Sequence, residues 1–573
     1  MATLNFKGKS FVQNHHLAVK YHQLVPKKEK SLTDKISLND NLIIHGDNLI
    51  ALKALLPTFA GKVKCVYVDV PYNTGNEKWV YNDNVNSPMM QEWLGKVVDK
   101  EDFTRHDKWL CMMMPRLKLL KELLRDDGVI FISCDDNELY NLKELLNEIF
   151  QESNWVGTII WWNVTDNNPT NIAIEHEYII CFSKNKEKLE GIWKSKISDA
   201  KDKLINIGKE LNRKYKNPAE LQNAYNKWFR ENKHYLGQLD RYKYIDKGGV
   251  YIGSQSVHNP GREGYRYDVK HPATKKPCKQ PLMGYRFPEN TMKELLSKGK
   301  ILFGEDENKI IELKVYAEEY EEKLPSVIQL DGRIGSYDLK EIYPETTKTF
   351  DNPKPVQLVK QIFSYLTNDT DIILDSFAGS GTTAHAVLDL NNEDGGNRKF
   401  ILVECEDYAD KITAERVRRV IKGVKSAKDE KIKNGLVGTF SFFELGEPIE
   451  MESILEGKKL PDYMELARYI FYTATGEEFN PSKVKQTKNF IGETKDYEVY
   501  LFYEPDIEKL KKLALTLDTA KKLGSFTGKK RLVFAPAKYL DLNDADLIER
   551  HGLKGIEYCQ LPFEIYRHTF KGG

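Results

Sequence analysis

The sequence predicts an α/β fold: a Rossmann-like parallel sheet that is interrupted by an inserted domain and followed by a small C-terminal α/β domain. Short apolar strand patterns alternate with helical patterns over residues 41–183, and the alternation resumes over 346–446. Such alternation is typical of parallel α/β sheets. The stretch between them, 184–345, lacks it and is rich first in Lys, Arg and Asn and then in Gly, Pro and Tyr. We therefore expect an N-terminal arm at 1–40, a sheet domain in two halves, an insert at 184–345 and a C-terminal domain at 447–573.

Length and composition set the broad class of the protein. With 573 residues the chain is too long for one hydrophobic core, so about two to four domains are expected. A hydrophobic content of 40% and a charged content of 30% describe a soluble globular protein. The formal net charge of +1 neither requires nor excludes nucleic acid, because a DNA-binding protein can concentrate its positive charge on one face.

The seven cysteines are scattered, with no spacing typical of a zinc or redox motif. We therefore expect a reduced, cytoplasmic setting. No run of about 18 apolar residues is present, which argues against a transmembrane helix, and residues 1–30 lack the apolar core of a signal peptide. His45, His176 and His385 have no second ligand at metal spacing, so no metal site is expected.

The first half of the sheet domain contains five strand patterns. The stretch 63–69 is nearly continuous in apolar character, as a buried parallel strand should be. The expected strands lie at 41–45, 63–69, 129–133, 156–162 and 178–182. The expected helices lie at 49–56, closed by Pro57, at 108–125, ended by Asp126-Asp127-Gly128, and at 139–150.

The second half begins at Lys354-Pro355, which leads into a helix that runs through Tyr365. The elements expected after it are a strand at 372–375, a helix at 384–390, a strand at 399–404 and a helix at 407–421. The C-terminal domain has strand patterns at 499–503, 531–534 and 555–558.

One candidate ligand site is the loop after the strand at 372–375. Asp375 ends this strand, and the small residues that follow let the backbone approach a ligand before a helix N-terminus with free N–H groups. Glu404 ends the next strand, where an acid can accept hydrogen bonds from a ribose. The loop has Ala384 in place of the third glycine of a dinucleotide fingerprint, and it lacks the lysine of a P-loop. This favours a nucleoside without phosphates over a nicotinamide cofactor, although a lone Gly-x-Gly also occurs in ordinary α/β turns.

A second candidate site lies far upstream, where Asp69-Val70-Pro71-Tyr72 follows the strand at 63–69. Proline holds itself and the preceding residue extended, so the Asp69 carboxylate and the Val70 carbonyl can point at one spot beside the Tyr72 ring. Two acceptors and a stacking face suit an aromatic amine such as that of adenine, which they would hold toward an electrophile. A base in a duplex must be flipped out to reach such a pocket. The alternative is an ordinary surface turn after a buried strand.

Asp47 follows the strand at 41–45 and precedes a helical pattern. It is either a helix cap or an acid that faces a ligand at the carboxyl edge of the sheet.

The two candidate sites together carry a family resemblance. Residues 377–381, Phe-Ala-Gly-Ser-Gly, resemble the S-adenosylmethionine motif of amino-group DNA methyltransferases, and residues 69–72 resemble their catalytic Asp-Pro-Pro-Tyr motif. The order of catalytic motif, insert and cofactor motif resembles the β group. The extended form Asp-x-Pro-Tyr-Asn-Thr-Gly resembles the modification subunits of type III restriction systems. Further matching stretches lie at 45–48, 126–133, 176–179 and 354–355.

The resemblance implies a site-specific enzyme that transfers a methyl group from S-adenosylmethionine to the N6 amino group of adenine in double-stranded DNA. Asp69, Pro71, Tyr72 and the main-chain carbonyl of Val70 would be catalytic. The residues that would bind the cofactor are Asp47, Lys354, Asp375, Phe377, Ala378, Gly379, Ser380, Gly381, Thr382 and Glu404. Lys354 would lie near the far end of the cofactor. The insert would read the DNA sequence.

The resemblance also implies partners other than DNA. These are a second copy of the chain, in a homodimer, and a helicase-nuclease restriction subunit, in the cytoplasm of a bacterium and away from membranes.

Val70 departs from the family pattern, because it stands where the family has its first proline. The main-chain carbonyl is kept while one rigid φ angle is lost, so we expect activity that is retained but reduced. Two other hypotheses stay open: methylation of the N4 amino group of cytosine, which the same pocket chemistry serves, and a DNA-recognition subunit with a vestigial catalytic pocket.

Overall fold

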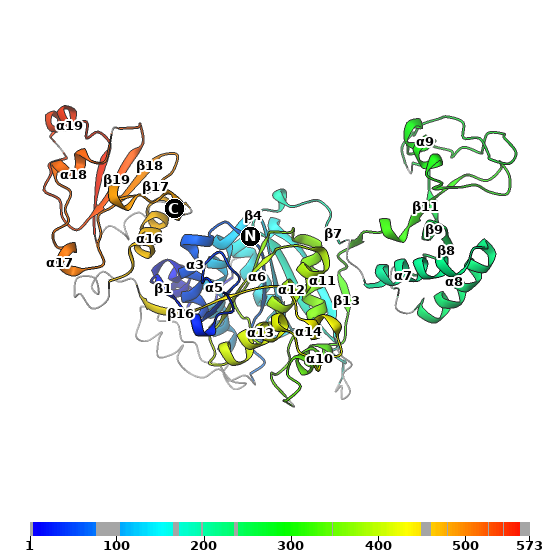
Figure 1. Ribbon diagram of the computed structural model, residues 1–573, viewed down its shortest axis with the longest axis horizontal. Helices are drawn as coiled ribbons and strands as arrows, with labels where there is room; N and C mark the ends of the chain where they lie inside the picture. Colours follow the sequence, from blue (N-terminus) through cyan, green and yellow to red (C-terminus); the bar gives the residue numbers. More distant parts are fainter. Residues whose placement is uncertain are drawn as a thin grey trace. The chain divides into compact units, whose positions relative to one another are not determined.

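The computed structural model divides the chain into two compact units (Figure 1). One unit is Ile192–Leu324, and the other combines Met1–Gly191 with Pro325–Gly573. The residues that the structure describes are 4–75, 104–163, 171–195, 199–233, 236, 239–259, 261–346, 348–448, 460–477, 479–524, 526–542 and 544–561.

A ten-stranded sheet forms the centre of the larger unit. Its order is β1-β16-β2-β15-β14-β3-β4-β6-β5-β13. The six strands from β16 to β4 are parallel, β6 runs against them, and β5 and β13 are parallel to each other. The strands are β1 (His22–Pro26), β16 (Ser441–Pro448), β2 (Leu42–His45), β15 (Lys399–Glu404), β14 (Ile372–Asp375), β3 (Val63–Asp69), β4 (Leu124–Cys134), β6 (His176–Ser183), β5 (Trp155–Trp162) and β13 (Val327–Gln329).

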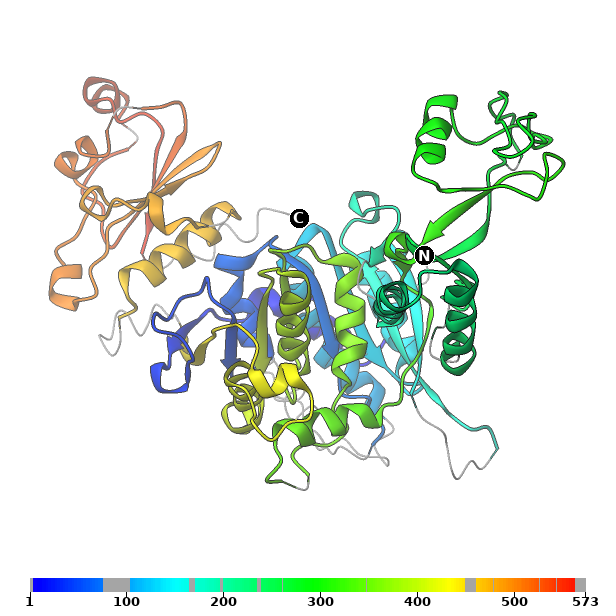
Figure 2. The same ribbon diagram turned by 45° about the vertical axis from the view of Figure 1, so that its right-hand side comes forward.

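Helices cover both faces of this sheet (Figures 1 and 2). One face carries α3 (Asn48–Phe59), α5 (Arg105–Leu123) and α6 (Leu139–Phe150), and the other carries α11 (Val356–Leu366), α12 (Thr382–Asp394) and α13 (Glu415–Lys422). A strand covered on both faces must be apolar along its whole length. In agreement, six of the seven residues of β3 are buried. The predicted α/β fold class is confirmed.

The direction of chain winding reverses between β14 and β3, which pair in parallel. From β14 the chain passes through α12 to β15 on one side, and from β3 it passes through α5 to β4 on the other side. In open α/β sheets, ligands bind beyond the carboxyl ends of the strands at such a switch point.

Three predicted helix ends differ from the structure. α3 continues through Pro57 to Phe59, because a proline removes only its own N–H and the helix ends two residues after it. α5 ends at Leu123, and Asp126-Asp127-Gly128 lies inside β4 instead of terminating the helix. The helix predicted at 407–421 begins with a π-helical turn at Ala409–Ala414 and continues as α13.

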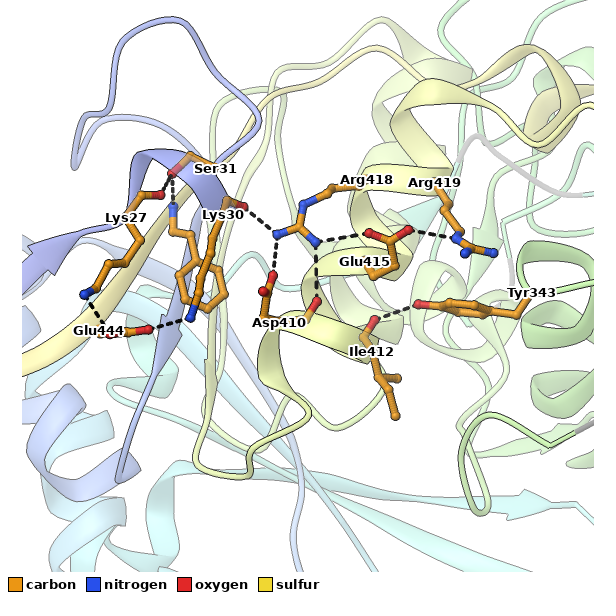
Figure 3. A network of polar contacts seen from close by, with 11 residues as sticks. Lys27, Lys30, Ser31, Tyr343, Asp410, Ile412, Glu415, Arg418, Arg419 and Glu444 are labelled. Atoms are coloured by element: carbon orange, nitrogen blue, oxygen red, sulfur yellow. Dashed lines mark hydrogen bonds and ion pairs between the residues drawn. The ribbon is translucent and has the colours of Figure 1, made fainter. Parts of the chain in front are cut away.

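The segment predicted as an N-terminal arm is attached to the sheet. β1 pairs antiparallel with β16 at the edge of the sheet. Figure 3 shows Glu444 between Lys27 and Lys30, at 3.0 and 2.6 Å, and Arg418 donating a 2.6 Å hydrogen bond to the carbonyl of Lys30. Before β1 lie the short helices α1 (Lys9–Val12) and α2 (His15–Ala18), and after it the 3₁₀ turn η1 (Lys28–Lys30).

The smaller unit has a core of its own. It spans fewer residues than the insert predicted at 184–345. The difference arises because β13 extends the main sheet by pairing with β5, and α10 (Arg333–Ile342) packs near α13. Its helices are α7 (Asp199–Lys214), α8 (Pro218–Asn232) and α9 (Glu289–Ser297). Its four-stranded sheet is β10 (Ile301–Leu302), β11 (Glu312–Tyr316), β9 (Gly249–Ser256) and β8 (Tyr244–Asp246), and its ends meet in the pair of β7 (Lys194–Ser195) and β12 (Glu322–Lys323).

The C-terminal region forms a second, four-stranded sheet in the order β17-β18-β19-β20, in which the last three strands are parallel. Its strands are β17 (Phe490–Glu493), β18 (Tyr497–Leu501), β19 (Lys530–Ala535) and β20 (Ile556–Gln560). Its helices are α16 (Tyr463–Thr475), α17 (Ile507–Leu510), α18 (Leu517–Lys521) and α19 (Ala545–His551). The rings of Tyr469 on α16 and Tyr21 lie 4.6 Å apart, which joins this region to the N-terminal segment. Among the described residues, no helix is both long and apolar enough to cross a membrane.

Candidate active site

The two motifs singled out in the sequence meet at the switch point of the sheet. The glycine loop, which we take as residues 376–382 with the first residue of α12, follows β14. The corner predicted to be catalytic, residues 69–73, which we call the catalytic corner, follows the neighbouring β3. Asp375 and Asp69 therefore end adjacent parallel strands, on the edge of the sheet where ligands bind.

Asp375 holds the glycine loop in place. One oxygen of its carboxylate accepts a 3.0 Å hydrogen bond from the main-chain N–H of Phe377, and the other accepts a 2.6 Å bond from the hydroxyl of Thr383. Burial raises the pKa of Asp375 to about 7. Both oxygens thus hold the loop and the start of α12, and the expected contact of Asp375 with the cofactor stays a prediction.

The loop needs its glycines for steric reasons. Gly379 and Gly381 have φ angles of 51° and 81°, in the left-handed region. A Cβ at Gly381 would also lie 3.1 Å from the carbonyl oxygen of Thr413. The hydroxyl of Thr413 donates a 2.6 Å hydrogen bond to the carbonyl of Gly379, so this residue holds the loop from the opposite side.

A buried cation lies beneath the loop. The guanidinium of Arg416 donates hydrogen bonds of 2.8 and 2.9 Å to the hydroxyls of Ser380 and Thr382. Arg416 is fully buried, and burial lowers its pKa to about 10, so it stays charged at neutral pH. The start of α12 therefore carries an arginine charge in addition to its free N–H groups.

Glu404 and Ala378 connect the loop to β15. The Glu404 carboxylate accepts hydrogen bonds from the N–H groups of Gly379, at 2.7 Å, and Glu406, at 3.0 Å. The N–H of Ala378 donates a 3.1 Å bond to the carbonyl of Val403. Burial raises the pKa of Glu404.

Asp47 caps α3, which is the simpler of the two roles considered from the sequence. Its Oδ1 accepts hydrogen bonds from the N–H groups of Leu49, at 2.8 Å, and Ile50, at 3.3 Å. Its Oδ2 lies 3.4 Å from the guanidinium of Arg116. One third of the side chain is exposed, so the cap leaves part of the carboxylate accessible.

The catalytic corner is braced from behind. The indole N–H of Trp109 donates a 2.7 Å hydrogen bond to the carbonyl of Pro71. Asn73 is fully buried with a φ of 58°, and its amide donates to the carboxylate of Glu138, which also lies 2.7 Å from a ring nitrogen of His106. Strained, buried backbone of this kind persists only where its surroundings hold it.

Lys354 connects the corner to the glycine loop. Its carbonyl accepts a 3.1 Å hydrogen bond from the hydroxyl of Thr382. Its ammonium lies 3.0 Å from Oδ1 of Asp69 and 3.1 Å from the carboxylate of Glu177, and it donates a 2.9 Å bond to the hydroxyl of Tyr72. The ammonium of Lys354 thus lies on the catalytic corner. Its expected place near the far end of the cofactor stays a prediction.

Tyr72 and Glu177 complete this cluster. The hydroxyl of Tyr72 donates a 2.6 Å hydrogen bond to one oxygen of Glu177, and the amide of Asn163 donates a 2.6 Å bond to the other. The ammonium of Lys354 also lies 4.9 Å from the Tyr72 ring and 5.5 Å from the Trp161 ring, within the range of cation–π attraction.

In this cluster, burial and the neighbouring charges shift the pKa values of Asp69 and Lys354 in opposite directions. Burial raises the pKa of Asp69, and the nearby ammonium of Lys354 only partly offsets this effect. Burial alone would lower the pKa of Lys354, but the charges of Asp69 and Glu177 raise it above its ordinary value. Burial, with the two carboxylates beside it, raises the pKa of Tyr72 well above its ordinary value. Lys354 therefore stays a cation, and Tyr72 stays neutral.

Several residues of the site had no role assigned from the sequence. Glu177 lies in a stretch that matched the family, but only the fold shows that it contacts Tyr72 and Lys354. Trp109 and Arg416 are ordinary residues of helical patterns, Glu138 directly precedes one, and none of the three belongs to a motif. Among the described residues, no group of three His, Cys, Asp or Glu side chains could hold a metal ion.

Comparison with known proteins adds a family and named relatives. A family model described as DNA methylase matches residues 63–415. The Mod subunit of the type III restriction-modification enzyme EcoP15I of Escherichia coli is 51% identical over 416 residues, which are 71% of this chain and 64% of that protein. The StyLTI Mod subunit of Salmonella typhimurium is 29% identical over 453 residues, 74% of this chain and 63% of that protein. The chain thus spans less than two thirds of the length of these two relatives.

Solved structures of low sequence identity also match. The cytosine-N4-specific PvuII DNA methyltransferase is 12% identical, with a TM-score of 0.31 over 66% of this chain and 86% of that chain. The complex of M1.HpyAVI with SAM is 15% identical, with a TM-score of 0.28 over 65% of this chain and 98% of that chain.

Proposed function

The chain belongs to the DNA methylase family, and we propose that it transfers a methyl group from S-adenosylmethionine to the N6 amino group of adenine in double-stranded DNA. The observation that carries this proposal is the meeting of the glycine loop and the catalytic corner at one switch point. Lys354 contacts both, through its carbonyl to Thr382 and its ammonium to Asp69. The proposed methyl-donor site and the proposed amine-binding corner would therefore be joined by one residue, Lys354.

The residues at the carboxyl edge of the sheet fit S-adenosylmethionine. This cofactor is a nucleoside without phosphates, and when bound it supplies an activated methyl group on a positively charged sulfur. Acidic side chains at the ends of β3 and β15, Asp69 and Glu404, suit a cation that carries ribose hydroxyls. Gly379 and Gly381 would let the backbone approach the cofactor, and Phe377, Ala378, Ser380 and Thr382 complete the loop that would hold it.

The catalytic corner would hold and activate the target amine. The Asp69 carboxylate and the Val70 carbonyl would accept its two N–H groups, and the Tyr72 ring would stack on the base after flipping. A methylated amine would have to lose one of its protons to a neighbouring acceptor. Asp69 is the acceptor that we assign, because its partly exposed carboxylate would already hold the amine, and burial raises its pKa.

The N4-cytosine hypothesis is not favoured. The curated relatives at 51% and 29% identity are Mod subunits of type III systems, and the motif resemblance associates that subunit type with adenine. We further propose that the unit Ile192–Leu324 reads the DNA sequence, and that the chain forms a homodimer and works with a restriction subunit in a bacterial cytoplasm.

Single-molecule sequencing of plasmid DNA, from a host free of methyltransferases, tests the proposal. Expression of the chain should place N6-methyladenine at one recurrent sequence, and the variant Asp69→Ala should abolish the mark while calorimetry still detects S-adenosylmethionine binding. N4-methylcytosine would overturn the choice of base. Donor binding by the wild-type chain without any methylated base would instead support a recognition subunit with a vestigial pocket.

A further inference from the structure

The carboxylate of Asp69 is held asymmetrically. Its Oδ1 is buried and lies 3.0 Å from the ammonium of Lys354, whereas 30% of the side chain as a whole is exposed. The exposed area must therefore belong to the remaining atoms, which include Oδ2. An incoming amine would meet Oδ2, because Lys354 already occupies the other oxygen.

Lys354 is in turn fixed by groups other than Asp69. Its side chain is 10% exposed, and its ammonium contacts the carboxylate of Glu177 and the hydroxyl of Tyr72. These two contacts and Asp69 match the three N–H donors of an ammonium group. Glu177 is fixed by Asn163 and Tyr72 at its two oxygens. The cluster is thus a closed network that leaves Lys354 little freedom.

The net charge of the cluster bears on the donor it would bind and on the protonation of Asp69. Two carboxylates and one ammonium sum to one negative charge, the opposite of the single positive charge on the sulfonium that the family's donor would bring. Without Lys354, two carboxylates would face one half-buried space, and such pairs shift their pKa values apart until one of them is protonated. A protonated Asp69 could not accept the proton of the amine.

We propose that Lys354 and Glu177 are positioning residues that set the ionisation and the orientation of the Asp69 carboxylate. Lys354 keeps this carboxylate ionised and oriented so that Oδ2 faces the substrate. Glu177 holds Lys354 and Tyr72 in place for this purpose. The inference rests on the proposed function, which assigns the amine to Asp69. Because the carbonyl of Lys354 accepts from Thr382, the same residue also links the cofactor loop to the catalytic carboxylate.

Five titratable groups act on Asp69 from the elements around it. They are Lys354 before α11, Glu177 on β6, Tyr72 in the corner, Tyr67 on β3 and Asp375 on β14. Lys354 lowers the pKa of Asp69, and Glu177 raises it. Removing the two side chains should therefore move the titration of Asp69 in opposite directions, which a purely structural role would not do.

The experiment compares the pH profile of kcat for DNA methylation in the wild type, Lys354→Met, Lys354→Arg and Glu177→Gln. We expect the acidic limb to move up by about one pH unit or more in Lys354→Met and down by a similar amount in Glu177→Gln. Lys354→Arg should keep the limb in place and lower only kcat. The control is Lys360→Met. This lysine lies on α11, 2.7 Å from Asp389 and 2.7 Å from Glu393, both on α12. Its loss should leave the acidic limb of the pH profile unchanged.

A second readout does not require activity. Thermal unfolding from pH 5 to pH 8 should show Lys354→Met gaining stability relative to the wild type as the pH falls, because protonation relieves the two facing carboxylates. Equal loss of kcat at every pH in Lys354→Met and Glu177→Gln, or parallel unfolding curves, would overturn the inference. A wild-type chain that methylates nothing would instead count against the proposed function, and the unfolding comparison would still decide the role of Lys354.

Discussion

At the scale of single residues, the chemistry of this site is decided by how burial and neighbouring charge compete. Burial raises the pKa of Asp69, Asp375 and Glu404, and each carboxylate has a different compensation. Asp69 has the ammonium of Lys354, while Asp375 and Glu404 have hydrogen bonds from the loop. Of these three acids at one sheet edge, one is therefore partly exposed and the other two hold the loop.

Val70 offers a direct test of the catalytic corner. The side chain is buried, and in the family pattern this position is a proline. Val70→Pro should raise turnover about two- to fivefold, because fixing one φ angle contributes about 0.4–1 kcal/mol of preorganisation. Val70→Ala, which shortens the side chain without fixing φ, is the control and should not raise turnover. Steady-state methylation rates with saturating donor measure both, and unchanged or lower turnover in Val70→Pro would contradict the expectation.

The raised pKa of Asp375 predicts that the stability of the protein depends on pH. Its pKa in the folded protein is about 7, well above the ordinary value of 3.8. A raised folded pKa means that the folded state binds the proton more tightly, so its contribution to the free energy of unfolding falls as pH rises from about 4 to about 7 and is level above that. Denaturant titrations at pH 5 and pH 8 should show a smaller difference for Asp375→Asn than for the wild type. An identical difference in the two proteins would contradict the role assigned to this carboxyl.

At the scale of elements, the glycine loop and the start of α12 are fixed together by the strands and the helix around them. The loop is held by Asp375 on β14, by Glu404 on β15 and by Arg416 on α13, so three neighbouring elements fix its backbone. The backbone of the loop is therefore already fixed before a ligand arrives, and such preorganisation lowers the cost of binding a small ligand.

The two glycines that flank α12 allow this to be tested with a matched pair. Gly381 and Gly395 have similar positive φ angles, 81° and 73°, but a Cβ meets the carbonyl of Thr413 only at Gly381. Gly381→Ala should destabilise the protein by about 1–3 kcal/mol and weaken donor binding at least about tenfold. Gly395→Ala should cost about 1–2 kcal/mol from its φ angle alone and leave donor binding unchanged. Calorimetry and denaturant unfolding measure both; equal donor affinity in the two variants would argue against a binding role for the loop.

At the scale of the whole molecule, the described site residues all belong to the larger unit. The smaller unit, Ile192–Leu324, has its own core, and its two ends meet in the antiparallel pair of β7 and β12. The proposed active site and the unit that we propose to read DNA are therefore separate parts of the chain.

Removal of the smaller unit should separate the two tasks. A chain in which a short Gly-Ser linker joins Gly191 to Pro325 should keep S-adenosylmethionine binding and lose site-specific methylation of DNA. The adjacent strands β7 and β12 bring the cut ends close enough for such a linker. Calorimetry for the donor and sequencing for the methyl mark give the two readouts. Retained site-specific methylation would assign sequence reading to another part of the chain.

The sequence was sufficient for the fold class, the family and both motifs. Strand and helix patterns are local, so periodicity predicted seven of the ten strands of the main sheet but not β1, β13 or β16. The two motifs carried the family that the comparisons confirm. Helix ends were predicted less well: α3 runs two residues past Pro57, and α5 ends before Asp126-Asp127-Gly128 because β4 begins at Leu124. The boundary of the insert was also too wide, since the pairing of β13 with β5 is a long-range contact.

Only the tertiary structure decided what each polar side chain of the site contacts. The sequence indicates that Asp69 and Glu177 are acids and Lys354 is a base, but it holds no distances between residues that are far apart in the chain. Folding brings Lys354 to within 3.0 Å of Asp69 and 3.1 Å of Glu177, and this placement gives the catalytic corner its charge. Local pattern thus determined the sheet and its two motifs, and the crossing of the chain at the switch point determined how the motifs act on each other.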